Sequence, residues 1–189
     1  MRVSSLLLLC SALLFFGCHN DEEQRQNNIP QQPSHEEVKE ALIKSHQMYI
    51  KQEADEITQY VKQHNYDMQA TTTGIYYMIT QHGKGGLAAI GDFATVSYSI
   101  SLLDGTVCYD SKTEGAKQFL VGKDAVESGV HQVVQLMHVG DKGLFIIPSY
   151  LALGLVGDKD KIPPGAVVIY DITLVSLKKQ KAVADTNLK

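Results

Sequence analysis

The amino-acid sequence predicts an α+β fold: an antiparallel sheet wrapped around one short helix, preceded by a long N-terminal helix. Three observations predict it. Apolar residues recur at helical spacing between residues 34 and 65, several later stretches alternate with a period of two, and one short stretch near residue 130 returns to helical spacing. Because the strands surround a single helix instead of alternating with helices, we expect them to pair antiparallel.

Length and composition narrow the class of protein. The chain has 189 residues and a formal net charge of −4, and 44% of its residues are hydrophobic. This apolar content excludes a wholly disordered chain, and the length allows one ordinary domain with an appendage or two small domains. The mildly acidic balance without a basic cluster argues against nucleic acid as a partner.

Residues 1–17 are predicted to be a lipoprotein signal peptide. A positive start, Met1-Arg2, precedes an apolar run of about fourteen residues, which has the length of a secretory signal and is too short to cross a hydrocarbon core of ~30 Å. The run ends at Gly17-Cys18, where the chain becomes polar. This junction resembles that of bacterial lipoproteins, in which the cysteine receives a diacylglyceryl group. We therefore expect lipid on Cys18; the alternative is an ordinary cleaved signal or an uncleaved anchor.

A tether and a helical arm follow the signal. Residues 18–33 are polar and contain two prolines, a composition that cannot form a core and predicts a flexible tether. A capping box, Ser34 with Glu37, then begins a helical arm that we expect over residues 34–65. Its apolar stripe comprises Ile43, Ile50, Ala54, Ile57 and Val61. We expect the stripe to pack on the following domain; a homodimer seam and a chaperone surface are the alternatives.

The strands and the short helix lie in a domain of residues 72–178, and residues 179–189 form a C-terminal tail. The expected strands are residues 75–79, 94–102, 119–122, 143–148 and 166–175. Asp104-Gly105 predicts a turn after the second of them. The expected helix carries apolar residues at helical spacing from Val126 to Met137 and ends at Gly140.

The sequence carries no motif for bond-making chemistry or metal binding. It contains no phosphate-binding loop, no paired CxxC, no HExxH and no GxSxG. The histidines are not spaced as metal ligands, and we expect His131 and His138 to face solvent. Cys108 is either a reactive nucleophile or, as its strand-like surroundings favour, a small buried hydrophobe. We therefore expect neither a metal nor a cofactor.

Several stretches taken together carry a family resemblance. They are Val96–Ser99, Leu103–Gly105, Tyr109–Ser111, Phe119–Lys123, Gln135–Gly140, Ile147–Ser149, Leu151–Gly154, Ile162–Pro164 and Tyr170–Ile172. In this order and spacing they resemble the FKBP-type peptidyl-prolyl cis–trans isomerases. The signal, the helical arm and the stretch Gly74–Tyr77 further resemble the gliding-motility-associated lipoprotein isomerases of Bacteroidetes (GldI-like).

The resemblance implies a reaction that breaks no bond. Rotation about a peptide bond costs ~18–20 kcal/mol because resonance resists the twist, and exchange at proline is still slow. An apolar pocket that excludes water favours the twisted amide, which is less polar than the planar amide. Such a reaction needs no nucleophile, metal or cofactor.

The resemblance also implies which residues form the pocket. The implied walls are Tyr98, Val126, Ile162 and Tyr170. Tyr109 is implied as a substrate-binding residue; it stands where the family typically has phenylalanine, and so keeps the ring and adds a hydroxyl. Asp110 is implied as a buried acceptor that orients the pocket, and it joins Tyr98 and Tyr170 as an implied catalytic residue. The backbone amide of Glu127 is implied as a donor to a substrate carbonyl.

Three positions depart from the family pattern. Val130 stands where the family usually has the tryptophan of the pocket floor, Leu153 where it has a tyrosine, and Lys117 where it has an aromatic residue. These changes widen the floor and remove a polar anchor, so we expect weaker binding of macrolide inhibitors and weaker catalysis. The alternative is that the pocket residues are ordinary core and that Asp110 stabilises a loop.

Two functions from different classes fit these features. The first is a lipid-anchored peptidyl-prolyl cis–trans isomerase that assists the folding of proline-containing exported polypeptides. It would lie in the cell envelope, on the periplasmic or surface face of the outer membrane, with a link to gliding motility or secretion machinery. The second is a binding or chaperone module with little or no turnover.

Overall fold

The structure, a computed structural model, describes residues 32–179. The chain divides into two units between residues 43 and 44. The predicted signal peptide, Cys18, and most of the predicted tether and tail lie outside the described residues. None of the helices within residues 32–179 combines the length and the apolar character needed to cross a membrane.

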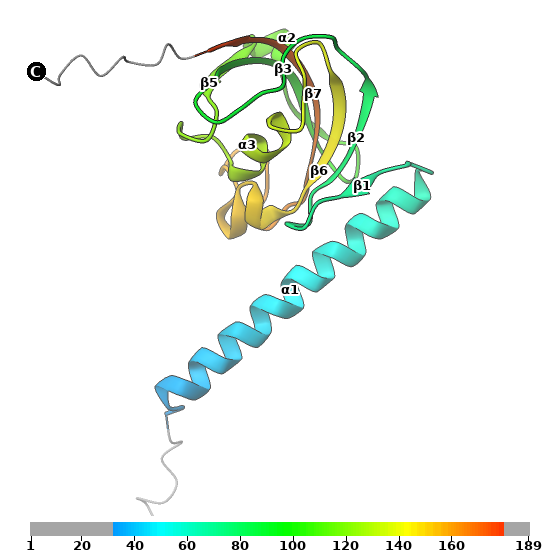
Figure 1. The fold of residues 1–189 in the computed structure, drawn as a ribbon. Coiled ribbons are helices and arrows are strands. Elements are labelled where there is room, and N and C mark those ends of the chain that lie inside the picture. Colours follow the sequence, from blue (N-terminus) through cyan, green and yellow to red (C-terminus); the bar gives the residue numbers. More distant parts are fainter. Residues whose placement is uncertain (1–31, 180–189) are drawn as a thin grey trace, which may run out of the picture. The chain divides into compact units, whose positions relative to one another are not determined.

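Helix α1 extends over His35–Gln63 (Figure 1). The capping box predicted at its start is confirmed. The Ser34 amide donates to the Glu37 carboxylate over 2.7 Å, and the Glu37 amide donates to the Ser34 hydroxyl over 3.3 Å. The bond from the Ser34 amide lowers the pKa of Glu37, so this side chain keeps its negative charge beside the positive end of the helix dipole.

Seven strands form one antiparallel sheet within the described residues. They are β1 (Gln69–Ala70), β2 (Tyr76–Gln81), β3 (Phe93–Leu102), β4 (Val107–Asp110), β5 (Lys117–Leu120), β6 (Lys142–Ile147) and β7 (Val168–Lys178). The order is β1-β2-β6-β7-β3-β4, and β5 also pairs with β3. Strand β3 pairs with β7 along its whole length, while β4 and β5 share its other edge. The predicted antiparallel sheet is confirmed.

The short helix α3 (Ser128–Val134) lies inside the curve of the sheet (Figure 1). Its side chains Val130, Val133 and Val134 are buried in the main apolar core. The helix is shorter than the predicted 126–137, because the backbone amides of Leu136 and Met137 bond three residues back and so form tight turns. The predicted arrangement of a sheet around one short helix is nevertheless confirmed.

Three one-turn helices have no counterpart in the sequence pattern. They are α2 (Ser111–Glu114), η2 (Ser149–Leu151) and η3 (Gly154–Val156). A helix of one turn is too short to produce a periodic apolar pattern, so periodicity cannot reveal it. All three border the cavity or the loop described below.

Residues 44–63 of α1 pack on the outer face of the sheet. Ile57 is 1% exposed and belongs to a second apolar cluster that includes Ile146 of β6. Because side chains alternate along a strand, the neighbouring Phe145 and Ile147 point to the opposite face and join the main core. In this part of the arm, the predicted stripe packs on the domain through Ile57 and Val61, whereas Ala54 is exposed.

Candidate functional site

A cavity of about 240 Å³ lies between the inner face of the sheet and helix α3. Eight of the nine residues that the sequence suggests for a pocket line it: Tyr98, Tyr109, Val126, Glu127, Val130, Leu153, Ile162 and Tyr170. The lining also includes Val96, Ile100, Glu114, Lys117, Phe119, Asp158 and Ile172. Asp110 is the predicted residue that does not line the cavity.

The pairing of the two central strands places the aromatic walls. Tyr98 of β3 pairs with Ile172 of β7, and Ile100 of β3 pairs with Tyr170 of β7. These four side chains share the inner face, so the two tyrosines lie diagonally opposite each other across the strands. Tyr170 is 4% exposed, whereas Tyr98 is half-buried at the opening.

The aliphatic walls come from segments that are distant in the sequence. Val130 projects from the buried face of α3, and Val126 lies just before that helix. Leu153 and Ile162 come from the long loop between β6 and β7. A concave, mainly apolar site assembled from separate segments is typical of a ligand pocket.

The hydroxyl of Tyr98 is tied to helix α2. It donates to the Glu114 carboxylate over 2.9 Å. Burial and this negatively charged acceptor raise the pKa of Tyr98 to about 12. The hydroxyl therefore stays protonated at physiological pH and holds the ring against the pocket opening.

The hydroxyl of Tyr109 joins strand β4 to the loop that carries Ile162. It donates a short hydrogen bond to Asp158, which raises the pKa of Tyr109. The other Asp158 oxygen accepts from the Ile162 amide over 2.8 Å. The Lys161 ammonium lies 4.5 Å from the centre of the Tyr109 ring. The tyrosine in place of the family's phenylalanine thus anchors a wall of the pocket.

Two donors within the pocket have no acceptor among the described residues. The Tyr170 hydroxyl makes no hydrogen bond within residues 32–179, and burial together with the nearby Glu127 carboxylate raises the pKa of Tyr170. The backbone amide of Glu127, which directly precedes α3, likewise donates to no acceptor in this part of the chain. Both donors are available to a substrate carbonyl.

Asp110 corrects the sequence-based assignment. Tyr109 lines the cavity, and because successive side chains of a strand point to opposite faces, Asp110 turns to the outer face. There it is the N-cap of α2 and accepts from the Lys112 amide over 2.7 Å. The carboxylate is half-exposed rather than buried against the pocket, and its charge contributes to the raised pKa of Tyr98.

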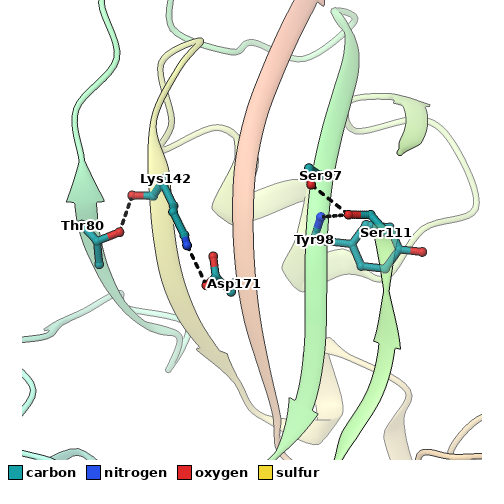
Figure 2. Close-up of polar contacts among 6 residues, drawn as sticks. All are labelled: Thr80, Ser97, Tyr98, Ser111, Lys142 and Asp171. Carbon is teal, nitrogen blue, oxygen red and sulfur yellow. Dashed lines mark hydrogen bonds and ion pairs between the residues drawn. The ribbon is translucent and has the colours of Figure 1, made fainter. Parts of the chain in front are cut away.

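Figure 2 shows the polar contacts of this outer face. The Ser111 hydroxyl accepts from the Tyr98 amide over 2.9 Å and lies 2.8 Å from the Ser97 hydroxyl. On the adjacent strands, the Lys142 ammonium lies 3.2 Å from the Asp171 carboxylate. Ser111 thereby fixes the backbone of β3 at the residue that supplies a pocket wall.

Three titratable residues outside the pocket differ in their surroundings. His131 does not simply face solvent as predicted: its Nδ1 accepts from the Gly122 amide over 2.9 Å, and its ring meets Phe119 edge-on. His138 is exposed, as predicted. Cys108 is buried, as predicted, and burial raises the pKa of its thiol. Within residues 32–179, no group of three or more metal-ligating side chains is arranged to hold a metal ion.

Sequence reasoning missed Glu114 and Asp158 as residues of the site. Glu114 ends the one-turn helix α2, and Asp158 lies in the long loop between β6 and β7. Both lie among other charged residues, where a carboxylate is expected to be solvated. Neither belongs to a motif that the resemblance uses. Their bonds to Tyr98 and Tyr109 depend on the fold and leave no signal in the sequence.

The fold and the pocket together define a class of protein. A curved antiparallel sheet closed by one short helix encloses an apolar cavity with tyrosine walls, and the chemistry available there is binding and orientation. Residues 85–175 match the family model described as FKBP-type peptidyl-prolyl cis-trans isomerase. This segment of the chain belongs to that family.

Relatives of known name support the assignment. The chain is 36% identical over 110 residues to the probable FKBP-type peptidyl-prolyl cis-trans isomerase FkpA of Neisseria meningitidis serogroup B, covering 58% of this chain and 40% of that protein. It is 33% identical over 107 residues to the outer membrane protein MIP of Legionella longbeachae, covering 57% of this chain and 46% of that protein. The chain thus spans less than half the length of these relatives.

Solved structures share the fold. The crystal structure of FkpA from Escherichia coli matches with a TM-score of 0.59 at 24% identity, covering 78% of this chain and 75% of that chain. The crystal structure of AtFKBP13 matches with a TM-score of 0.57 at 26% identity, covering 59% of this chain and 99% of that chain.

Proposed function

We propose that this protein is a peptidyl-prolyl cis–trans isomerase that assists the folding of proline-containing exported polypeptides. The observation that carries the proposal is the pocket: tyrosines and aliphatic side chains from separate segments enclose one cavity. Ordinary core residues would fill this space. The family of residues 85–175 supports the same reaction.

The pocket performs this reaction by binding a twisted amide more tightly than a planar one. The planar amide is the more polar form, so transfer from water to an apolar cavity destabilises it relative to the twisted form. The side chains of Tyr98, Val126 and Ile162 exclude water around the proline ring. No proton transfer or covalent intermediate is required.

Two donors give the substrate its orientation. The Glu127 amide and the Tyr170 hydroxyl have no acceptor within residues 32–179, so each can bind a carbonyl of the substrate without breaking a bond of the protein. The Tyr170 hydroxyl supplies a polar anchor inside a pocket in which Leu153 has none to offer. Because the Tyr170 hydroxyl takes the place of the hydroxyl that is missing at Leu153, we expect activity despite the departures at Val130 and Leu153.

The test is the refolding of a protein whose slow phase is limited by prolyl isomerisation. We expect the rate of the slow phase to rise in proportion to the concentration of this protein. An unchanged slow phase with suppressed aggregation would support the second candidate function, a binding or chaperone module. The observations that favour that alternative are Val130 and Leu153, which depart from the family pattern in the pocket, and the apolar stripe of the arm.

We further propose that lipid on Cys18 anchors the protein in the cell envelope, on the periplasmic or surface face of the outer membrane. The sequence of the junction supports lipidation, and one relative bears the name outer membrane protein. The GldI-like features support a link to gliding motility or secretion machinery. Fatty-acid labelling of the full-length protein tests the anchor: Cys18→Ala should abolish it, and a fully processed, unlabelled wild type would exclude it.

A homodimer through α1 is the remaining proposal on partners. Ile43 of its apolar stripe is 49% exposed and the nearby apolar residue Val38 is 42% exposed, which supports the proposal. Sedimentation equilibrium of the wild-type protein should show a concentration-dependent dimer. A monomer at every concentration would exclude it.

A further inference from the structure

The loop between β6 and β7, residues 148–167, supplies one side of the pocket. Leu153, Asp158 and Ile162 line the cavity from this loop. Apart from the one-turn helices η2 and η3, it contains no regular structure, so its path depends on contacts with the rest of the fold. Both ends contact the same two turns of helix α1.

Glu53 of α1 holds the first end. Glu53 is 3% exposed, and its partner Ser149 is 1% exposed. One Glu53 oxygen accepts from the Ser149 amide over 3.0 Å, and the other accepts a short hydrogen bond from the Ser149 hydroxyl. Both oxygens are thus satisfied by one residue of the loop, which fixes the position and the orientation of Ser149.

Tyr49, one helical turn earlier, holds the second end. Its hydroxyl donates to the Gly165 carbonyl over 3.0 Å and lies 3.3 Å from the Ser149 hydroxyl. Gly165 has φ +71°, and a Cβ at this position would lie 2.3 Å from the Tyr49 hydroxyl. Glycine is therefore required here both by the backbone conformation and by the close approach of the tyrosine.

The buried contact of Glu53 with the loop carries a cost in free energy. Burial of a carboxyl group is unfavourable without hydrogen bonds, and a hydrophobic residue at position 53 would pack with less constraint. Glu53 also lies outside the pocket, and the proposed isomerase mechanism does not use it. Within the described residues, its carboxylate accepts hydrogen bonds from Ser149 of the loop and also acts on the Tyr49 hydroxyl.

We propose that Glu53 and Tyr49 are positioning residues for the pocket: through Ser149 and Gly165, helix α1 fixes both ends of the loop and hence the walls formed by Leu153 and Ile162. This inference rests on the proposed isomerase function. It makes the second half of the arm part of the active domain.

The test compares Glu53→Gln and Tyr49→Phe with the matched control Glu56→Gln. Glu56 is exposed on the same helix and bonds only to Gln52 in the described part of the chain. In the full chain, we expect Glu53→Gln and Tyr49→Phe to raise KM for a proline peptide by about threefold to tenfold, with a smaller change in kcat, and Glu56→Gln to change neither. The backbone amides of residues 149–165 should exchange with solvent faster in the first two variants only.

The KM–kcat split separates positioning from a purely structural role. A purely structural role would reduce the folded fraction, and hence apparent kcat, while KM stayed constant. Folded Glu53→Gln and Tyr49→Phe proteins with wild-type KM and wild-type exchange in the loop would overturn the inference. If Glu53→Gln does not fold, Tyr49→Phe alone decides, since it removes one oxygen atom. If the wild type has no isomerase activity, the proposed function fails. The exchange measurement then still tests whether Glu53 and Tyr49 fix the loop.

Discussion

At the scale of single residues, Tyr170 has two roles: its ring packs in the core and its hydroxyl is a donor. Removing the hydroxyl oxygen removes the donor and leaves the packing of the ring. Its ring is buried in the core, but its hydroxyl has no acceptor within residues 32–179. We predict that Tyr170→Phe lowers kcat/KM for proline peptides by about threefold to tenfold, or ~0.7–1.4 kcal/mol. The free energy of unfolding in urea should not fall by more than ~0.5 kcal/mol, because no hydrogen bond of the folded state is lost.

Tyr77→Phe is the matched control for this prediction. The Tyr77 hydroxyl donates to Gln69 over 2.8 Å outside the cavity, so its removal should leave kcat/KM unchanged. Equal activity of Tyr170→Phe and the wild type would show that the hydroxyl does not contact the substrate.

Asp110 tests whether the pocket needs a carboxylate or a helix cap. Because its side chain caps α2, Asp110→Asn should keep both the cap and the activity, whereas Asp110→Ala should lose ~1 kcal/mol of stability. Asp110→Ala should also lower kcat/KM by about threefold, since α2 positions Glu114 beside Tyr98. Steady-state kinetics and urea unfolding measure both effects. Equal loss of activity in the two variants would favour a direct role of the charge.

The raised pKa of Tyr98 predicts a stability change in alkali. The folded pKa of about 12 lies above the ordinary value of 10.0. The folded state therefore keeps a proton that the unfolded chain releases, and the stabilisation is complete below pH 10 and is lost as the pH rises towards 12. Urea unfolding at several alkaline pH values should show a smaller loss in Tyr98→Phe than in the wild type. Identical profiles would mean that the hydroxyl does not hold its proton in the fold.

The residues of the site show what sequence reasoning can and cannot supply. The resemblance located eight lining residues, because the spacing of its motifs matches the order of the elements that carry them. It misplaced Asp110, whose direction depends on the alternation along β4 and on a helix of four residues. It missed Glu114 and Asp158, whose bonds to tyrosines form only when the loops are in place.

At the scale of elements, helix α1 changes character along its length. Ile57 is 1% exposed, whereas Ile43, which belongs to the same stripe but lies nearer the start of the helix, is 49% exposed. We predict that Ile57→Ala lowers the free energy of unfolding by ~2–5 kcal/mol through the cavity it leaves, and that Ile43→Ala changes it by less than ~0.5 kcal/mol. Urea unfolding measures both. A large loss in Ile43→Ala would show that this part of the helix is buried in solution, as a dimer seam requires.

The elements also differ in how well their patterns predict them. The expected strand 94–102 corresponds to β3, and the expected strand 143–148 corresponds to β6, each within one residue, because one face of each is buried. The contact of α1 with the loop after β6 joins residues 96 positions apart. No periodicity encodes such a contact, so the role of Glu53 could be seen only in the structure.

At the scale of the whole molecule, the compact unit of the fold extends beyond the segment that matches the family. The family model covers residues 85–175, but the compact unit of the fold begins at residue 44. The second half of α1 contributes an apolar cluster on the outer face and hydrogen bonds to the pocket loop. We therefore expect that activity requires residues 44–63 as well as the family segment.

The central claim is that the cavity between the sheet and α3 catalyses rotation about prolyl bonds. Two-dimensional exchange NMR of a proline-containing peptide measures this most directly, because it reports the cis–trans rate at equilibrium without a coupled reaction. With a substoichiometric amount of the wild-type protein, we predict exchange on the subsecond timescale instead of the tens to hundreds of seconds of the free peptide, and a clear reduction of this effect in Tyr170→Phe. An exchange rate equal to that of the free peptide, with folded wild-type protein present, would contradict the account.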